Sequence, residues 1–142
     1  SPANFGDALE LIGARWLDDS IRPGEMAELM TIWRVTDPQK VGPLVPPAFK
    51  TDIVLFTHVM DNAGDIIAQQ DSLEAPSWDW LEGDIFLQVH PVTIPGGVAP
   101  GLYKTTVGAY DRSSGERTPL LNPAGEIVDN RAFVVPLEVN ER

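Results

Sequence analysis

The chain of 142 residues is long enough for one domain with a sizeable core, and its 21 Asp and Glu against 10 Lys and Arg give a formal net charge of -11. This acidic balance disfavours binding to nucleic acid or to anionic membrane surfaces. The absence of cysteine excludes disulfides, thiolate metal sites and cysteine nucleophiles, and no apolar run approaches the roughly 18 residues that a membrane span needs.

Two segments near the N-terminus, residues 8–17 and 25–35, carry features of both helix and strand. The residues with helical spacing are Leu9, Ile12 and Trp16 in the first segment, and Met26, Leu29, Met30 and Trp33 in the second. Gly13, however, interrupts the first segment where a β-bulge would exchange its two faces. The second segment ends in Thr31-Ile32-Trp33, residue types that favour strands. We therefore predict two strands, with Trp16 and Trp33 in the core.

A proline-rich connection, residues 36–51, follows and is long enough to cross from one sheet to another. Residues 52–61, DIVLFTHVMD, are apolar on both faces, which is typical of a central strand covered on both sides. The motif DNAGD that begins at Asp61 then predicts a hairpin turn in which Asn62 and Gly64 supply positive φ angles.

The segment SWDWLEGD, residues 77–84, contains the candidate ligand-binding residues of the sequence, Trp78 and Trp80. In an extended chain the two indoles point to the same side, about 6–7 Å apart, and such flat rings can stack on the faces of sugars. The alternative is that one or both rings cap the open end of the fold, because tryptophan is usually largely buried. The acids of this loop, Asp79, Glu82 and Asp84, are more typical of a solvated loop than of a glycoside hydrolase, since nothing in the sequence makes a cleft around them.

The segment APGLYKTTVGAYDRSSGERTPL, residues 99–120, predicts a strand that begins after Pro100-Gly101 and a hairpin closed by Ser113-Ser114-Gly115. Tyr103, Val107 and Ala109 share the face expected to contact the core. We expect the Tyr103 hydroxyl to bond to nearby backbone, as in the tyrosine corner of immunoglobulin-like sandwiches. Gly108 leaves room for a second backbone or a large side chain to approach.

The last segment, RAFVVPLEV, predicts a strand with Phe133, Val135, Leu137 and Val139 on one apolar face. Pro136 lacks an amide donor, so this strand is expected at a sheet edge or with a bulge. Because turn signals recur along the whole chain, we predict an all-β fold, an immunoglobulin-like or jelly-roll-type antiparallel β-sandwich, formed by residues 1–142 as a single domain. The chain opens on Ser-Pro without a methionine, and we expect it to be a fragment of a longer protein.

The ordered set of motifs resembles a family of β-sandwich domains that are appended, usually C-terminally, to multi-pass membrane glycosyltransferase-like proteins and to surface proteins of bacteria. The motifs are NFGDALELIG, RPGEMAELMTIWRV, LFTHVMDNAGDIIAQQD, WLEGDIFLQVHPVTIP, APGLYKTTVGAYD and GERTPL. The resemblance covers nearly the whole chain, and segment 36–51 is longer than the family pattern. It implies an extracytoplasmic, non-catalytic sandwich in a membrane-anchored protein, and it assigns no functional residues.

The remaining candidate ligands do not assemble into a metal or catalytic site. His58 and His90, the only histidines, lie on predicted strands without a third zinc ligand, so we expect both to be packed and hydrogen-bonded. Four oxygen-bearing residues around the predicted hairpin could contribute to a calcium site, but the hairpin itself requires an Asp-Asn-x-Gly turn. These four are Asp61, Asn62, Asp65 and Asp71. The sequence therefore predicts no metal, no cofactor and no catalytic residue.

Three functional hypotheses are compatible with these observations. The first is a non-catalytic, extracytoplasmic accessory module, with carbohydrate as the leading ligand. The second is a structural spacer or interaction domain that contacts neighbouring domains of the same chain. The third, a glycoside-acting enzyme, is disfavoured because no nucleophile or ligand set assembles. None of the three involves nucleic acid or insertion of these residues into a membrane.

Overall fold

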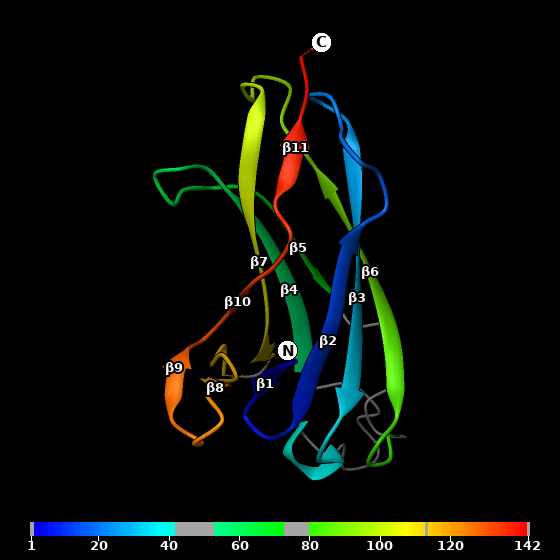
Figure 1. Ribbon diagram of the computed structural model, residues 1–142, viewed down its shortest axis with the longest axis vertical. Coiled ribbons are helices and arrows are strands. Elements are labelled where there is room, and N and C mark those ends of the chain that lie inside the picture. The colour runs from blue at the N-terminus through cyan, green and yellow to red at the C-terminus, as the bar shows by residue number, and fades with distance from the viewer. Residues whose placement is uncertain (1, 42–52, 73–79, 113, 142) are drawn as a thin grey trace.

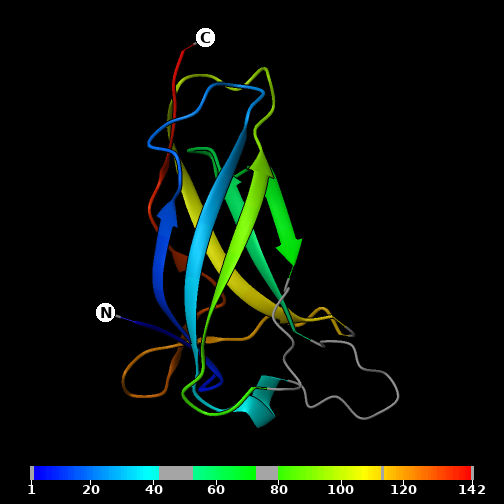
Figure 2. The ribbon, with the colours of Figure 1, turned by 90° about the vertical axis from the view of Figure 1, so that its right-hand side faces the viewer.

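The computed structural model describes residues 2–41, 53–72, 80–112 and 114–141. These residues form two antiparallel sheets packed face to face, with β2, β3 and β6 along the right of Figure 1 and β4 and β7 along the left (Figures 1 and 2). The predicted all-β sandwich is confirmed. Among the described residues, no helix is long and apolar enough to cross a membrane.

The first sheet has six strands in the order β6-β3-β2-β1-β8-β9. Their bounds are β1 Ala3–Phe5, β2 Leu9–Trp16, β3 Met26–Val35, β6 Ile85–Thr93, β8 Leu120–Leu121 and β9 Ile127–Asp129. The second sheet has the order β10-β7-β4-β5, and β11 also pairs with β7. Its bounds are β4 Ile53–Met60, β5 Ile66–Ser72, β7 Gly101–Asp111, β10 Ala132–Phe133 and β11 Leu137–Val139. A short 3-10 helix, Pro38–Val41, follows β3.

Both ambiguous N-terminal segments are strands, as predicted. Leu11 lies opposite Trp33 whereas Gly13 lies opposite Ile32, so β2 carries an extra residue at this point and forms a β-bulge. The bulge exchanges the faces of β2, because Leu9 and Leu11 are buried before it and Trp16 is buried after it. Strand β3 lies in the first sheet and β4 in the second, so the chain crosses between sheets where the proline-rich connection was predicted.

Strand β4 is the predicted central strand, since each of its residues is buried and it pairs with both β5 and β7. The predicted hairpin joins β4 to β5, and the amide of Gly64 donates to the carbonyl of Asp61 at 3.0 Å. Gly64 has a φ of 87°, as expected, but Asn62 does not adopt a positive φ. The correction follows from the turn chemistry: the Asp61 carboxylate accepts the amides of Ala63 and Asp65 at 2.9 Å each, which holds the turn without a left-handed residue at position 62.

The core between the sheets is centred on Trp33, which is fully buried, as predicted. Its ring lies 5.5 Å from that of Phe5 and is stacked on Phe86 at 6.5 Å, measured between ring centroids. Trp16 is also buried, as predicted, and its indole N–H donates to the carbonyl of Val135 at 3.0 Å. Because β2 belongs to the first sheet and residue 135 lies between β10 and β11 of the second, this bond ties the two layers together at their edge.

The final strand differs from the prediction. Phe133 lies opposite Thr106 on β7 and Leu137 lies opposite Tyr103, so four steps along this segment match three steps along β7. The segment therefore contains a bulge at the sheet edge, as Pro136 indicated. The predicted apolar face is wrong in its first half, because the bulge exchanges the faces: Phe133 is exposed whereas Leu137 is buried.

Tyr103 lies near the start of β7 and packs against the core. Its hydroxyl donates to the carbonyl of Ala99 at 2.6 Å. The predicted backbone bond is thus present. We expect Tyr103→Phe to lower the free energy of unfolding by about 1 kcal/mol, because the substitution removes only this bond. Denaturant unfolding of the two proteins measures the difference, and an unchanged midpoint would show that water replaces the bond without loss.

Gly108 permits a close approach, as predicted, and the approaching group is the ring of Phe56 on the neighbouring strand. A Cβ at position 108 would lie 2.6 Å from Phe56 Cε2 and closer still to Cζ. We expect Gly108→Ala to cost about 1–3 kcal/mol of unfolding free energy through overpacking. Gly97→Ala is the matched control, since a Cβ there meets no atom within 4 Å. Phe56→Leu in the Gly108→Ala background should recover part of the loss, and equal costs for the two glycine variants would contradict the close contact.

Candidate functional site

The two tryptophans predicted to bind a ligand are Trp78 and Trp80. Trp80 is only 8% exposed, and its indole is stacked on Phe86 with ring centroids 4.6 Å apart. Trp80 thus extends the aromatic stack of the core where β6 begins. This burial agrees with the alternative that the ring caps the end of the fold and disfavours an exposed platform at Trp80, because stacking on Phe86 removes the ring from solvent. Trp78 and Asp79 lie outside the described residues.

Two of the acidic residues singled out in the sequence, Asp61 and Asp84, hold local turns. The carboxylate of Asp84 accepts the amide of Leu81 at 2.9 Å, and Asp61 holds the β4–β5 turn. Asp71 is remote from that turn, since it lies opposite Phe56 on β4, so the predicted grouping of Asp71 with Asp61 and Asp65 is wrong. Among the described residues, no three His, Asp or Glu side chains lie close enough together to hold a metal ion.

His90 belongs to a buried polar cluster between the sheets and is hydrogen-bonded, as predicted. Its Nε2 lies 3.1 Å from the Thr31 hydroxyl and its Nδ1 lies 3.0 Å from Gln70 Oε1. Because an amide oxygen can only accept, Nδ1 carries the proton and Nε2 accepts from Thr31. Burial lowers the pKa of His90 to about 4. The imidazole is therefore neutral near pH 7 and bridges β3, β5 and β6, a structural role with no access for a ligand.

A second polar site lies on the outer face of the second sheet, the face that points away from the core. A pocket of about 170 Å³ opens there. It is lined by Phe56 and His58 from β4, Asp71 from β5, Tyr110 from β7, and Gly115 and Arg117 from the turn that follows β7. We call this the outer-face pocket. It gathers side chains from positions 56 to 117 because β4, β5 and β7 are neighbours in the sheet.

The turn after β7 folds Arg117 back over the sheet. The amide of Gly115 donates to the carbonyl of Asp111 at 2.7 Å. The backbone of Arg117 then forms an isolated antiparallel β-bridge with that of Tyr110. The Arg117 guanidinium carbon then lies 4.5 Å from the centroid of the Phe56 ring, in a cation–π contact. This contact explains why Phe56 is buried although it lies on an outer sheet face.

His58 is the unusual residue of the outer-face pocket. Its ring packs on Phe56 with centroids 4.7 Å apart and is 8% exposed, yet it makes no hydrogen bond to any described residue. The expectation of a hydrogen-bonded histidine is therefore wrong for His58. Burial lowers its pKa, Arg117 and Arg131 lower it further, and Asp71 opposes them. The imidazole of His58 is thus neutral near pH 7, with one donor and one acceptor facing the pocket region.

Tyr110 and Asp71 form the opposite wall of the outer-face pocket. The Tyr110 hydroxyl donates to Asp71 Oδ2 at 2.9 Å, and burial together with this hydrogen bond raises the pKa of Tyr110. The bond leaves Asp71 with further lone pairs to accept donors from a ligand. The wall therefore offers an aromatic surface beside a hydrogen-bond acceptor.

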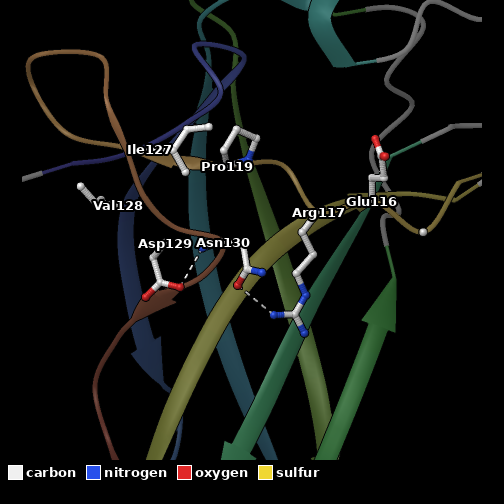
Figure 3. Close-up of a pocket in the computed structure, with 8 residues that line it drawn as sticks. Glu116, Arg117, Pro119, Ile127, Val128, Asp129 and Asn130 are labelled. Carbon is white, nitrogen blue, oxygen red and sulfur yellow. Dashed lines mark hydrogen bonds between the residues drawn. The ribbon is translucent and has the colours of Figure 1, made fainter.

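A larger open groove of about 770 Å³ continues from the outer-face pocket and shares Gly115 and Arg117 with it (Figure 3). In this groove the Arg117 guanidinium donates to Asn130 Oδ1 at 3.1 Å. Asp129 lies alongside and accepts the amide of Asn130 at 2.7 Å. An extended ligand could therefore contact both the pocket and the groove through Arg117.

Sequence reasoning missed this site except for His58 and Asp71. The available signal was His58 itself, an ionisable residue in the middle of a strand that is apolar on both faces. Its partners could not be found from spacing, because Tyr110 and Arg117 approach it only through strand pairing and a turn.

The chain matches several solved structures, among them the following two. The C-terminal domain of wzt matches 99% of this chain and 78% of its own with a TM-score of 0.56 and 12% identity. A CARDB domain from Pyrococcus furiosus, crystallised in complex with di-metal ions, matches 99% of this chain and 90% of its own with a TM-score of 0.47 and 10% identity. No protein-family model and no curated protein sequence matches the chain. The similarity to the wzt domain confirms, at the level of fold, the β-sandwich that the sequence resemblance implied.

Proposed function

We propose that this domain is a non-catalytic accessory module that binds carbohydrate at the outer-face pocket. An extracytoplasmic location, within a larger membrane-anchored protein, is part of the proposal and rests on the sequence resemblance. The ligand-binding role moves from the tryptophan loop to the outer face of β4, β5 and β7, because Trp80 is buried in the core stack.

One observation supports this function above the others: the outer-face pocket combines a hydrogen-bonding set with an aromatic surface. Asp71 accepts hydrogen bonds, Arg117 donates them, and Tyr110 presents its ring beside them. Sugars carry hydroxyls that donate and accept, together with apolar C–H faces that pack on aromatic rings. A pocket with a few fixed polar groups beside apolar surface is the usual form of a small-ligand site.

The chemistry of the pocket favours binding over hydrolysis. Glycoside hydrolysis generally requires two carboxyl groups that flank the scissile bond, about 5 to 9.5 Å apart. Asp71 is the one carboxylate that lines the outer-face pocket among the described residues, and it already accepts the Tyr110 hydroxyl. A single engaged carboxylate can orient a sugar but cannot act as both acid and nucleophile.

The test is titration calorimetry of the domain against a panel of neutral and acidic oligosaccharides. We expect at least one to bind, and Asp71→Asn or Tyr110→Ala to weaken its binding at least tenfold. Asp18→Asn, an exposed acid in the loop after β2, is the matched control and should leave binding unchanged. Thermal melts of each variant verify the fold.

Two outcomes would contradict the proposed function or its site. Failure of every saccharide to bind would favour the spacer hypothesis. Binding that survives Asp71→Asn and is lost in Trp78→Ala would return the site to the loop predicted from the sequence.

A further inference from the structure

We propose that the ligand of the outer-face pocket is acidic: a saccharide that carries a carboxylate or phosphate group, bound over His58 between Arg117 and Arg131. This inference rests on the proposed function and specifies the class of sugar. It is drawn from two arginines without a carboxylate partner in the described part of the chain and from the imidazole of His58 on the same sheet face.

Arg117 and Arg131 lack a carboxylate partner within the residues that the structure describes. The chain has 21 acidic and 10 basic residues, so a cation can find a carboxylate partner. Arg34, for example, pairs with Glu10 at 2.8 Å. Among the described residues, neither Arg117 nor Arg131 has a carboxylate oxygen within 4.0 Å. Two guanidinium groups therefore retain their charge, unneutralised by direct pairing, on one face of a strongly acidic protein.

These two arginines contact the β4 residues on either side of His58. Arg117 lies over Phe56, two residues before His58 on β4. Arg131 donates to the sulfur of Met60, two residues after it, at 3.4 Å. Alternate residues of a strand point to the same face, so the three β4 positions form one row. Both cations act on His58 electrostatically, against the single opposing charge of Asp71.

Polar groups in and beside this row make no hydrogen bond to another described residue. His58 is more than nine-tenths buried, lines the outer-face pocket and makes no hydrogen bond to a described residue. Directly across the sheet, the Thr106 hydroxyl is fully buried and also has no hydrogen-bond partner. Buried polar groups are nearly always hydrogen-bonded, so the Thr106 hydroxyl is an exception, and the pocket-lining imidazole of His58 remains available to hydrogen-bond with a ligand. An anionic oxygen would accept from His58 and from the neighbouring guanidinium groups.

The acidic residues of the region define the orientation of the ligand. Asp71 lies on the β5 side of the pocket, and Glu116 and Asp129 line the adjoining groove. These carboxylates repel an anion and accept sugar hydroxyls. The acidic group of the ligand therefore belongs over His58, with its neutral hydroxyls toward Asp71 and the groove.

The charge state of His58 supplies an independent readout. Burial and the two arginines hold its pKa below the ordinary value in the free protein. A bound anion favours the protonated imidazole and raises that pKa, so binding takes up a proton and strengthens as the pH falls toward this pKa. The other groups that face His58 are Arg117, Arg131 and Asp71, with Tyr110 hydrogen-bonded to Asp71.

The experiment compares matched pairs of oligosaccharides at constant ionic strength. One set carries uronate carboxylates and is compared with its carboxyl-reduced forms, a second carries phosphate and is compared with its dephosphorylated forms, and inorganic phosphate alone is a third arm. We expect an acidic member to bind at least tenfold more tightly than its neutral counterpart, and NMR titration to show a raised His58 pKa in the complex. The arm that binds identifies the acidic group.

Charge-removing variants locate the effect. Arg117→Gln and Arg131→Gln should each reduce the preference for the acidic form at least threefold, and His58→Gln should remove the dependence on pH. Arg15→Gln, an exposed arginine on the first sheet, is the matched control. Arg117→Lys keeps the charge if Arg117→Gln destabilises the fold, and should retain part of the preference.

The outcomes separate this inference from the proposed function. Equal binding of acidic and neutral forms, through Asp71 and Tyr110, would overturn the inference and leave carbohydrate binding in place. Absence of binding by any saccharide would overturn both. Inorganic phosphate that binds as tightly as the phosphorylated sugar would reduce the site to a simple anion site, and would also contradict the inference.

Discussion

Replacing Trp33 with alanine is expected to lower the free energy of unfolding by about 3–5 kcal/mol, the largest effect of a single substitution in this domain. The indole is fully buried, and it packs between Phe5 and Phe86 at the centre of the core. Its N–H also donates to the Thr31 hydroxyl at 2.8 Å, so the substitution removes a donor from a buried oxygen as well as leaving a cavity. Denaturant unfolding followed by circular dichroism measures the loss.

Two further variants keep the Trp33 prediction interpretable. Trp33→Phe retains an aromatic ring and should cost less than the alanine variant, because the cavity is smaller. Leu87→Ala, on the outer face of the same sheet and 58% exposed, should change the free energy by no more than about 0.5 kcal/mol. A loss below about 1 kcal/mol for Trp33→Ala would mean that the centre of the core lies elsewhere.

Acid is expected to destabilise the domain through His90. The pKa of His90 is about 4 in the folded protein, against 6.5 for an unperturbed histidine. Between these two pH values His90 is protonated in the unfolded chain but neutral in the folded protein. The free energy of unfolding is therefore greatest above about pH 6.5 and decreases as the pH falls toward 4. The full window corresponds to about 3 kcal/mol, of which about 2 kcal/mol should appear between about pH 7 and pH 4.5.

The variant His90→Gln isolates this contribution. It should be less stable than the natural chain at about pH 7, because it disturbs the bonds to Thr31 and Gln70, but its stability should depend less on pH. His58→Gln is the control histidine variant and should retain most of the acid sensitivity. Titration of the carboxylates contributes similarly to the pH dependence of stability in all three proteins. A difference in the slope of unfolding free energy against pH is therefore due to His90. Identical slopes for the natural chain and His90→Gln would contradict the burial of a neutral imidazole.

Local rules were sufficient for the longer strands, for the two bulges and for most of the packing residues named from the sequence. Gly13 indicated the bulge in β2 and Pro136 the one before β11, because each residue restricts what a regular ladder can accept. Gly108 and Tyr103 were identified for the contacts they make. Periodicity failed for residues 133–135, where one inserted residue reverses which side chains face inward.

The opening hairpin and the candidate site were beyond such rules. Gly6 and Asp7 both adopt positive φ and turn β1 into β2, a geometry that the sequence FGD signals only weakly. The outer-face pocket depends on strand order, since His58, Asp71 and Tyr110 meet only because β5, β4 and β7 are adjacent. For Trp80 the sequence left both an exposed platform and a buried cap open, because its stacking partner, Phe86, lies beyond a turn.

Strand β1 gives the domain a particular order of events during synthesis. Asn4 lies between Glu10 on β2 and Leu121 on β8, so one side of β1 finds its partner within a few residues and the other only after more than a hundred. One edge of β7 also pairs with strands that are synthesised later, β10 and β11. At a translation rate of roughly 5–20 residues per second, the hairpin of β1 and β2 waits several seconds with an unpaired edge. Such distant pairings also slow refolding into the millisecond-to-second range, so a nascent chain of this domain offers a long interval in which chaperones can bind.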